Sequence, residues 1–197
     1  MQAKDKFLEK INILIIVLCL FFSNNIYAEN INEKILNYNN SLKNSTANFI
    51  QTNNNYLQEG IIFFGNKRIK IAYTKPQKIT IILSEKKGIY INHELKESQF
   101  FATRNSYIKF LFDVFHKKEY LQNLDVTESD YEIEIIEKID LDNIFYNIKL
   151  VYENKPIKLR RLEIKNDKEE TQMGFFNHNQ EKSFEKKFFS MIDPYLN

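Results

Sequence analysis

Residues 56–76 read YLQEGIIFFGNKRIKIAYTKP and decide the fold class. The segment 67–74 alternates, with Ile69, Ile71 and Tyr73 on one face, which predicts a half-buried β-strand. Residues 56–64 form the strand before it, and Gly65-Asn66 fit a two-residue hairpin turn between them. The four residues before that turn are apolar on both faces, which is typical of a strand buried on both sides, or of one whose inner face lines a cavity. The stretch therefore predicts an antiparallel hairpin within a larger sheet.

Short strands of the same kind continue on both sides of this hairpin. They are expected at residues 45–52, 79–83, 88–92, 96–102, 131–137, 143–153, 157–165, 170–177 and 181–189. Two segments have helical spacing instead: residues 31–42, and residues 107–115 with Asn105 or Ser106 as the N-cap. Residues 117–124 extend the second helix or form a third. Ten or eleven strands with tight turns and no linker predict one mainly β (α+β) domain whose antiparallel sheet rolls up.

Residues 1–28 have the layout of a secretory signal peptide, with a weakly basic start, a ten-residue apolar run and Ala28 at the expected cleavage site. Ten apolar residues fall short of the ~20 that a transmembrane anchor needs. A lipoprotein signal ending at Cys19 is a third interpretation, but Leu18 stands where that signal has a small residue. We therefore expect an exported single domain of residues 29–197. It contains no cysteine, so it has no disulfide framework.

This domain offers little of the chemistry that enzymes use. It has no Gly-x-Ser-x-Gly elbow and no glycine-rich phosphate loop. His93-Glu94 begins like a zinc motif, but Glu97 occupies the position of the second histidine. Its 25 basic and 24 acidic residues give a net charge of about +1, too small to attract nucleic acid. We expect a protein that is not an enzyme, has no metal or other cofactor, and carries an unusually large aromatic surface.

Several segments, in this order, resemble the LolA family of periplasmic lipoprotein carriers. Residues 45–52 resemble the strand that opens the family's mature domain, and residues 60–64 resemble its glycine-plus-aromatic second strand. Residues 70–76 resemble its basic and aromatic segment ending in proline, and residues 107–115 lie where the family has its lid helix. Two features differ from the family. Gly65-Asn66 replaces a basic residue followed by proline, and Phe or Tyr occupies the family's Trp positions.

The resemblance implies an unclosed antiparallel half-barrel of about eleven strands, with two or three helices as a lid. It implies a monomer in the periplasm that binds the acyl chains of lipidated proteins. The cargo would come from an inner-membrane ABC transporter and pass to an outer-membrane lipoprotein acceptor. Such a cargo needs a protein that shields it from water, because exposing an acyl chain to water costs roughly 0.8 kcal/mol of free energy per CH₂. The leading alternative is a binding protein for another lipid or amphiphile, followed by an interaction domain with a dry core and by an enzyme acting on lipids.

On this resemblance, the early strands and the lid helix line an acyl-chain cavity. The residues expected there are Phe49, Ile62, Phe64, Ile71, Tyr73, Ile81, Leu83, Tyr90, Ile108, Leu111, Phe112 and Phe115. A one-residue slip of register would invert the set on any strand. The family also has a basic residue that bonds to the lid and keeps the empty form closed. Arg68 is the first candidate for this lid-holding residue and Lys70 the second, with a solvated strand face as the alternative for both.

Overall fold

The structure is a computed structural model that describes residues 30–54, 56–104, 106–141, 143–181, 183–185 and 187–196. The expected signal peptide, residues 1–28, lies outside the described residues. Every helix and strand named below belongs to the compact unit of residues 31–197. Within the described part of the chain, no helix has the length and apolar character needed to cross a membrane.

The described residues of this unit form eleven antiparallel strands and three helices. The elements are α2 (Ile31–Ser41), β1 (Ser45–Asn53), β2 (Tyr56–Gly65), β3 (Arg68–Lys75), β4 (Ile79–Leu83), β5 (Lys87–Asn92), β6 (Glu97–Ala102), α3 (Tyr107–His116), α4 (Lys118–Gln122), β7 (Asp125–Glu128), β8 (Glu132–Leu141), β9 (Ile144–Asn154), β10 (Ile157–Lys165) and β11 (Glu170–Gln180). Each strand pairs with its chain neighbour within β1–β6 and within β7–β11, and β1 pairs with β11 to join the two halves. The two edges of the sheet are therefore β6 and β7.

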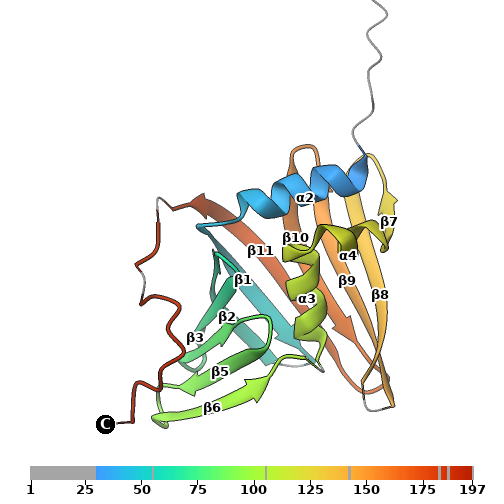
Figure 1. Ribbon diagram of the computed structural model, residues 1–197. Helices are drawn as coiled ribbons and strands as arrows, with labels where there is room; N and C mark the ends of the chain where they lie inside the picture. Colours follow the sequence, from blue (N-terminus) through green and yellow to red (C-terminus); the bar gives the residue numbers. More distant parts are fainter. Residues whose placement is uncertain are drawn as a thin grey trace, which may run out of the picture. The chain divides into compact units, whose positions relative to one another are not determined.

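The sheet curls into a half-barrel that stays open, with α3 and α4 against its concave side and α2 across one end (Figure 1). This confirms the predicted mainly β fold with helices as a lid. The deepest part of the core lies on the concave side, where inward-facing residues of β8 and β9 are fully buried beneath the helices. They include Ile133, Ile135, Ile148, Leu150 and Tyr152. Alternation along these strands positions the core, because every second side chain points inward.

One predicted turn is displaced by one residue, and one strand was not predicted. The hairpin turn is Asn66-Lys67 and not Gly65-Asn66, because Gly65 still pairs with Arg68 and Lys67 takes the positive φ of 51°. The short strand β7 was not predicted. Its sequence, Asp-Val-Thr-Glu, has a single apolar residue, so it carries no alternation that a pattern could detect.

The predicted last strand at residues 181–189 is also wrong. The described residues in this stretch form no strand, and turn-type hydrogen bonds run from Phe188 N to Glu185 O and from Ser190 N to Lys187 O, both at 2.9 Å. The aromatic side chains here do not alternate between two faces. Phe184, Phe188 and Phe189 instead pack against one another, with ring centroids 4.9 to 5.3 Å apart. Their mutual packing explains why the strand pattern fails.

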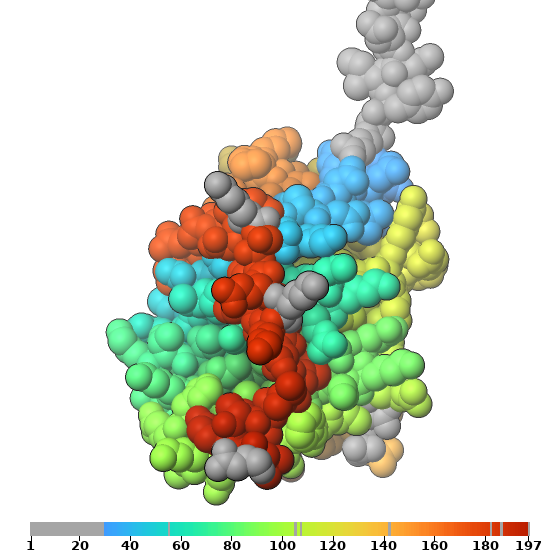
Figure 2. Space-filling model, turned by 60° about the vertical axis from the view of Figure 1, so that its left-hand side comes forward, coloured from blue at the N-terminus to red at the C-terminus, as the bar shows by residue number. Residues whose placement is uncertain are grey.

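This C-terminal segment covers the convex face of the first half of the sheet. It crosses that face as a single red band in Figure 2. Phe63, which points outward from β2, packs on Phe184 and Phe188, and Phe189 lies against Gly65. Further along, Ile82, Ile89 and Ile91 are buried beneath residues of the same segment: Phe189, Met191 and Tyr195. The two apolar faces at residues 62–64 are thus explained, because Ile62 and Phe64 face the interior and Phe63 lies under the C-terminal segment.

Candidate functional site

The concave face of β2–β5 presents a row of aliphatic side chains at matching register. Ile62 stands opposite Ile71, Ile71 opposite Ile81, and Ile81 opposite Tyr90. A second row runs from Phe64 through Ile69 to Leu83. The predicted facing of these strands is therefore the one in the structure. Because neighbouring strands in a sheet lie about 5 Å apart, these rows form a continuous apolar wall.

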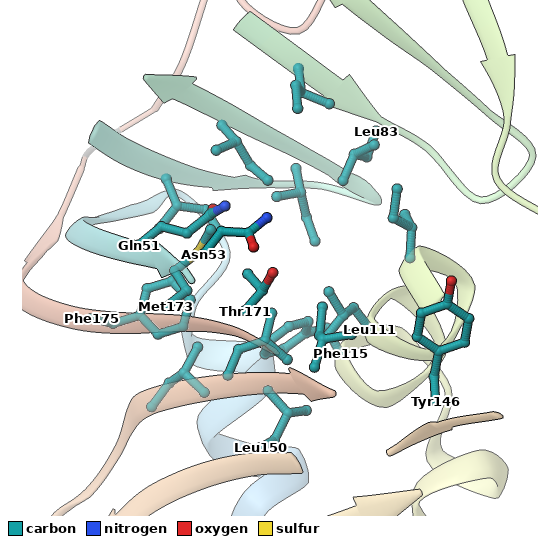
Figure 3. Close-up of a pocket in the computed structure, with 18 of the residues that line it drawn as sticks. Gln51, Asn53, Leu83, Leu111, Phe115, Tyr146, Leu150, Thr171, Met173 and Phe175 are labelled. Carbon is teal, nitrogen blue, oxygen red and sulfur yellow. The ribbon is translucent and has the colours of Figure 1, made fainter. Parts of the chain in front are cut away.

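The wall, the second half of the sheet and α3 enclose a cavity of about 270 Å³. Figure 3 shows its lining side chains converging on a common space. The lining is aliphatic and aromatic over most of its extent: Ile62, Ile69, Ile71, Tyr73, Ile81, Leu83, Ile108, Leu111, Phe115, Tyr146, Leu150, Leu159, Leu162, Ile164, Met173 and Phe175. Polar residues line it only at one end: Gln51, Asn53, Asn166, Glu169 and Thr171. A cavity of this composition can hold an apolar chain.

Eight of the twelve residues predicted for the cavity lie on its wall. They are Ile62, Ile71, Tyr73, Ile81, Leu83, Ile108, Leu111 and Phe115. The other four do not line it. Phe49 lies over Gly60 with its ring centroid 5.1 Å from that of Tyr73, and Phe64 is covered by the ring of Phe115.

Tyr90 and Phe112 complete the set that does not line the cavity. Tyr90 stands opposite Ile81, one strand nearer the open edge, and is half-buried there. Phe112 is 3% exposed and packs on His116, with ring centroids 4.4 Å apart. The apolar stripe of α3 is wider than the cavity, so only part of it can face the cavity. That the eight wall residues contact acyl chains stays a prediction.

The second half of the sheet supplies residues that sequence reasoning did not place at the cavity. Leu150 lies on β9, Leu159 and Leu162 on β10, and Met173 and Phe175 on β11. Alternation along these strands is visible in the sequence, as in Ile148, Leu150 and Tyr152. It could have identified the inward face, although not which inward residues reach the cavity.

Arg68 and Lys70 do not hold the lid. Both belong to the face of β3 opposite Ile69 and Ile71, and therefore point away from α3. The ammonium group of Lys70 lies 4.0 Å from the centroid of the Phe188 ring and donates to the Phe188 carbonyl at 3.5 Å. Arg68 borders a hollow formed with residues of the C-terminal segment. Successive side chains of a β-strand point to opposite faces. Because Ile69 and Ile71 point into the half-barrel, Arg68 and Lys70 point out of it.

The contacts that fix α3 come from other residues. Asn39 of α2 is 5% exposed, and its Nδ2 donates to the carbonyl of Val114 at 3.1 Å. The same side chain accepts a hydrogen bond from the Tyr152 hydroxyl at 3.3 Å, so it bridges α2, α3 and β9. Burial raises the pKa of Tyr152, which keeps this hydroxyl protonated as a donor. The amide of Asn39 thus ties the lid helix to the wall behind it.

An ion network holds the C-terminal end of α3 to the β4–β5 turn. The ammonium group of Lys117 lies 2.8 Å from Asp113 Oδ1 and 3.1 Å from Glu85 Oε1, and Lys109 pairs with the other oxygen of Asp113. The two carboxylates raise the pKa of Lys117, and Lys117 lowers the pKa of Glu85. Thr103 supports the same turn by donating to the Glu85 carbonyl at 2.8 Å. Both contacts therefore hold the C-terminal part of α3, one through a buried amide and the other through charged side chains.

The described residues include no group of three or more His, Cys, Asp or Glu side chains that could bind a metal ion. His93, which begins the incomplete zinc motif, contacts Thr80 Oγ1 at 2.8 Å and the Tyr195 hydroxyl at 2.9 Å. It thereby helps to attach the C-terminal segment to the convex face.

The sequence matches no protein-family model and no curated protein. Among solved structures, the crystal structure of MucB in complex with MucA(peri) is similar at 8% identity and a TM-score of 0.41, over 79% of this chain and 57% of that one. The structure of LprF from Mycobacterium bovis is similar at 10% identity and a TM-score of 0.34, over 75% of this chain and 91% of that one. This chain thus spans little more than half of the MucB chain. Both similarities are weak.

Proposed function

We propose that this protein is a carrier that binds the acyl chains of lipids or lipidated proteins in the half-barrel. The observation that supports this is the cavity of about 270 Å³, walled by aliphatic and aromatic side chains and closed by an amphipathic helix. Burial of each CH₂ of a chain stabilises the complex by roughly 0.8 kcal/mol. A chain therefore needs no precisely placed polar partner along most of its length.

The finer role we propose is the one implied by the LolA resemblance. The exported domain, residues 29–197, would act in the periplasm, receive lipidated proteins from an inner-membrane ABC transporter and pass them to an outer-membrane acceptor. It would do so as a monomer and without catalysing a reaction. The expected signal peptide and the order of the LolA-like segments support this proposal.

A second candidate function is the binding of a free lipid or another amphiphile. The volume of the cavity supports this second candidate. A cavity of about 150 Å³ holds one benzene molecule, so 270 Å³ takes roughly ten to twelve carbon atoms. That is one short acyl chain, and a cargo with three chains requires the lid to move outward.

Copurification distinguishes the two functions. The full chain would be expressed with export to the bacterial periplasm, isolated without detergent, and analysed intact by native mass spectrometry. A lipidated protein bound one-to-one supports the lipoprotein carrier, and a free lipid supports the alternative. If the folded protein carries neither and also binds no hydrophobic fluorescent probe, the cavity is an ordinary packing defect and both proposals fail.

A further inference from the structure

The two ends of the cavity differ in chemistry. One end lies near helix α2, where the Leu159 main-chain amide donates to the hydroxyl of Tyr38 at 2.9 Å and Leu159 itself lines the wall. The opposite end lies where β1 ends and β11 begins. There the lining changes to Gln51, Asn53, Asn166, Glu169 and Thr171, and Glu169 is exposed to solvent. The cavity therefore runs from an apolar end to a polar rim.

Two side chains at this rim have unused hydrogen-bonding groups. Asn53 and Thr171 stand opposite each other on β1 and β11, and Figure 3 shows the two side chains close together. Within the described residues, neither the Asn53 amide nor the Thr171 hydroxyl makes a hydrogen bond to another group. Gln51 beside them is already engaged, since it accepts from the Tyr73 hydroxyl at 2.8 Å and donates to Gln58 at 3.3 Å. Asn53 and Thr171 together offer donors and acceptors to whatever fills the rim.

The rim also lacks a positive charge. No lysine or arginine is among the described residues that line the cavity, and the one carboxylate there belongs to Glu169. The ammonium group of nearby Lys165 is paired with Glu170 at 3.4 Å. Carboxylate and phosphate head groups are normally bound by Arg or Lys, so an anionic head would find no partner at this rim and would face a like charge.

We propose that an amphiphile enters the cavity with its apolar chain leading, and that its neutral head group stays at the rim. There Asn53 and Thr171 form hydrogen bonds with the ester, amide or hydroxyl groups of the head. This inference rests on the proposed function, because it presupposes that the cavity binds an acyl chain. It defines the ligand class as single chains of about ten to twelve carbons joined to an uncharged, hydrogen-bonding head. Such heads occur in acylglycerols and in the amide-linked chains of lipidated peptides.

Four ligands with the same twelve-carbon chain test this assignment: 1-monolauroylglycerol, an N-lauroyl dipeptide amide, laurate and dodecyltrimethylammonium. Affinities would be measured on the delipidated full chain by displacement of a hydrophobic fluorescent probe. The two neutral ligands are expected to bind about tenfold more tightly than laurate. They gain one or two hydrogen bonds to Asn53 and Thr171 that laurate does not form, at about 1 kcal/mol each. The isosteric Thr171→Val, alone and with Asn53→Leu, should remove this preference without changing the binding of the probe.

Thr127→Val is the matched control, since Thr127 lies exposed on β7, away from the cavity. It should leave all affinities unchanged. Tighter binding of the glycerol ligand would identify free lipid as the source of the head group, and tighter binding of the amide would identify lipidated peptide. Equal binding of all four ligands, unaffected by Thr171→Val, would overturn the head-group assignment while leaving the carrier proposal intact. Strongest binding of the cationic ligand would overturn it in favour of Glu169. If the wild-type protein binds neither probe nor ligand, the carrier proposal itself fails.

Discussion

The side-chain amide of Asn39 donates to the main-chain carbonyl of Val114 at 3.1 Å, which joins α2 to the C-terminal part of the lid helix. Asn39→Ala leaves this carbonyl and the Tyr152 hydroxyl buried without their partner. We expect a loss of about 1–3 kcal/mol in the free energy of unfolding, measured by urea denaturation. Asn40→Ala, one residue further and exposed, is the control and should change stability little. Equal stability of the two variants would show that Asn39 does not fasten the lid.

Gly60 lies beneath the ring of Phe49, and this approach requires a glycine. A β-carbon at Gly60 would stand 2.3 Å from the Ala72 carbonyl oxygen and 2.6 Å from Phe49 Cζ. Gly60→Ala should therefore destabilise the protein by about 1–3 kcal/mol through overpacking. At Gly174 the nearest such atom is 4.0 Å away, so Gly174→Ala should be tolerated. Chemical denaturation of both variants tests the difference, and similar stabilities would contradict the packing argument.

Leu111 and Phe112 are neighbours on α3 with different surroundings, because only Leu111 lines the cavity. Leu111→Asp should weaken binding of a hydrophobic probe on the order of tenfold, because it places a charge on the cavity wall, with a smaller loss of stability. Phe112→Asp buries a charge in the core and should cost at least about 3 kcal/mol of stability. Probe titration and thermal unfolding of both variants separate the effects. If Phe112→Asp weakened probe binding and Leu111→Asp mainly lowered stability, Phe112 and not Leu111 would contact the ligand.

The Lys117–Glu85 pair predicts a pH dependence of lid attachment. Lys117 lowers the pKa of Glu85 below 4.5, so the contribution of this carboxylate is present above pH 4.5 and is lost as the pH falls through the lower folded value. The raised pKa of Lys117 keeps its contribution complete below pH 10.5. The stability difference between wild type and Lys117→Met should therefore be constant from about pH 5 to 10 and shrink in acid. A difference that does not change with pH would exclude the ion pair as the cause.

Lys70 should attach the C-terminal segment rather than the lid. Its partial burial lowers its pKa, yet the Phe188 ring and carbonyl hold the ammonium group in place. Lys70→Ala should make residues 187–196 cleavable by limited proteolysis, because a cation–π contact of about 1 kcal/mol is lost. Lys75→Ala, which removes an exposed pair with Glu59, is the control. Unchanged cleavage would show that the aromatic cluster alone holds the segment.

The alternation of apolar residues along β2–β4 was sufficient to predict the inward faces of Ile62, Ile71 and Ile81. Of the four residues that the helical spacing on α3 predicted for the cavity wall, three line it. Alternation fails where a segment has no repeating pattern, as in β7 and the C-terminal segment, whose position depends on the shape of the surface beneath it. It also cannot distinguish a side chain facing a space from one that fills it, and this is why Phe49 and Phe64 were assigned to the cavity.

The helix pair α3–α4 lies between β6 and β7 in the chain, and these strands are also the two edges of the open sheet. The lid is thus tethered at both of its ends to opposite sides of the gap that it spans. Because both ends of the helix pair are attached, it cannot rotate outward about a single hinge. Outward displacement of the lid is therefore coupled to separation of β6 from β7. A larger cargo must widen the whole half-barrel when it displaces the lid. Few residues separate β6 from α3 and α4 from β7, and the length of these connections limits how far the half-barrel can widen.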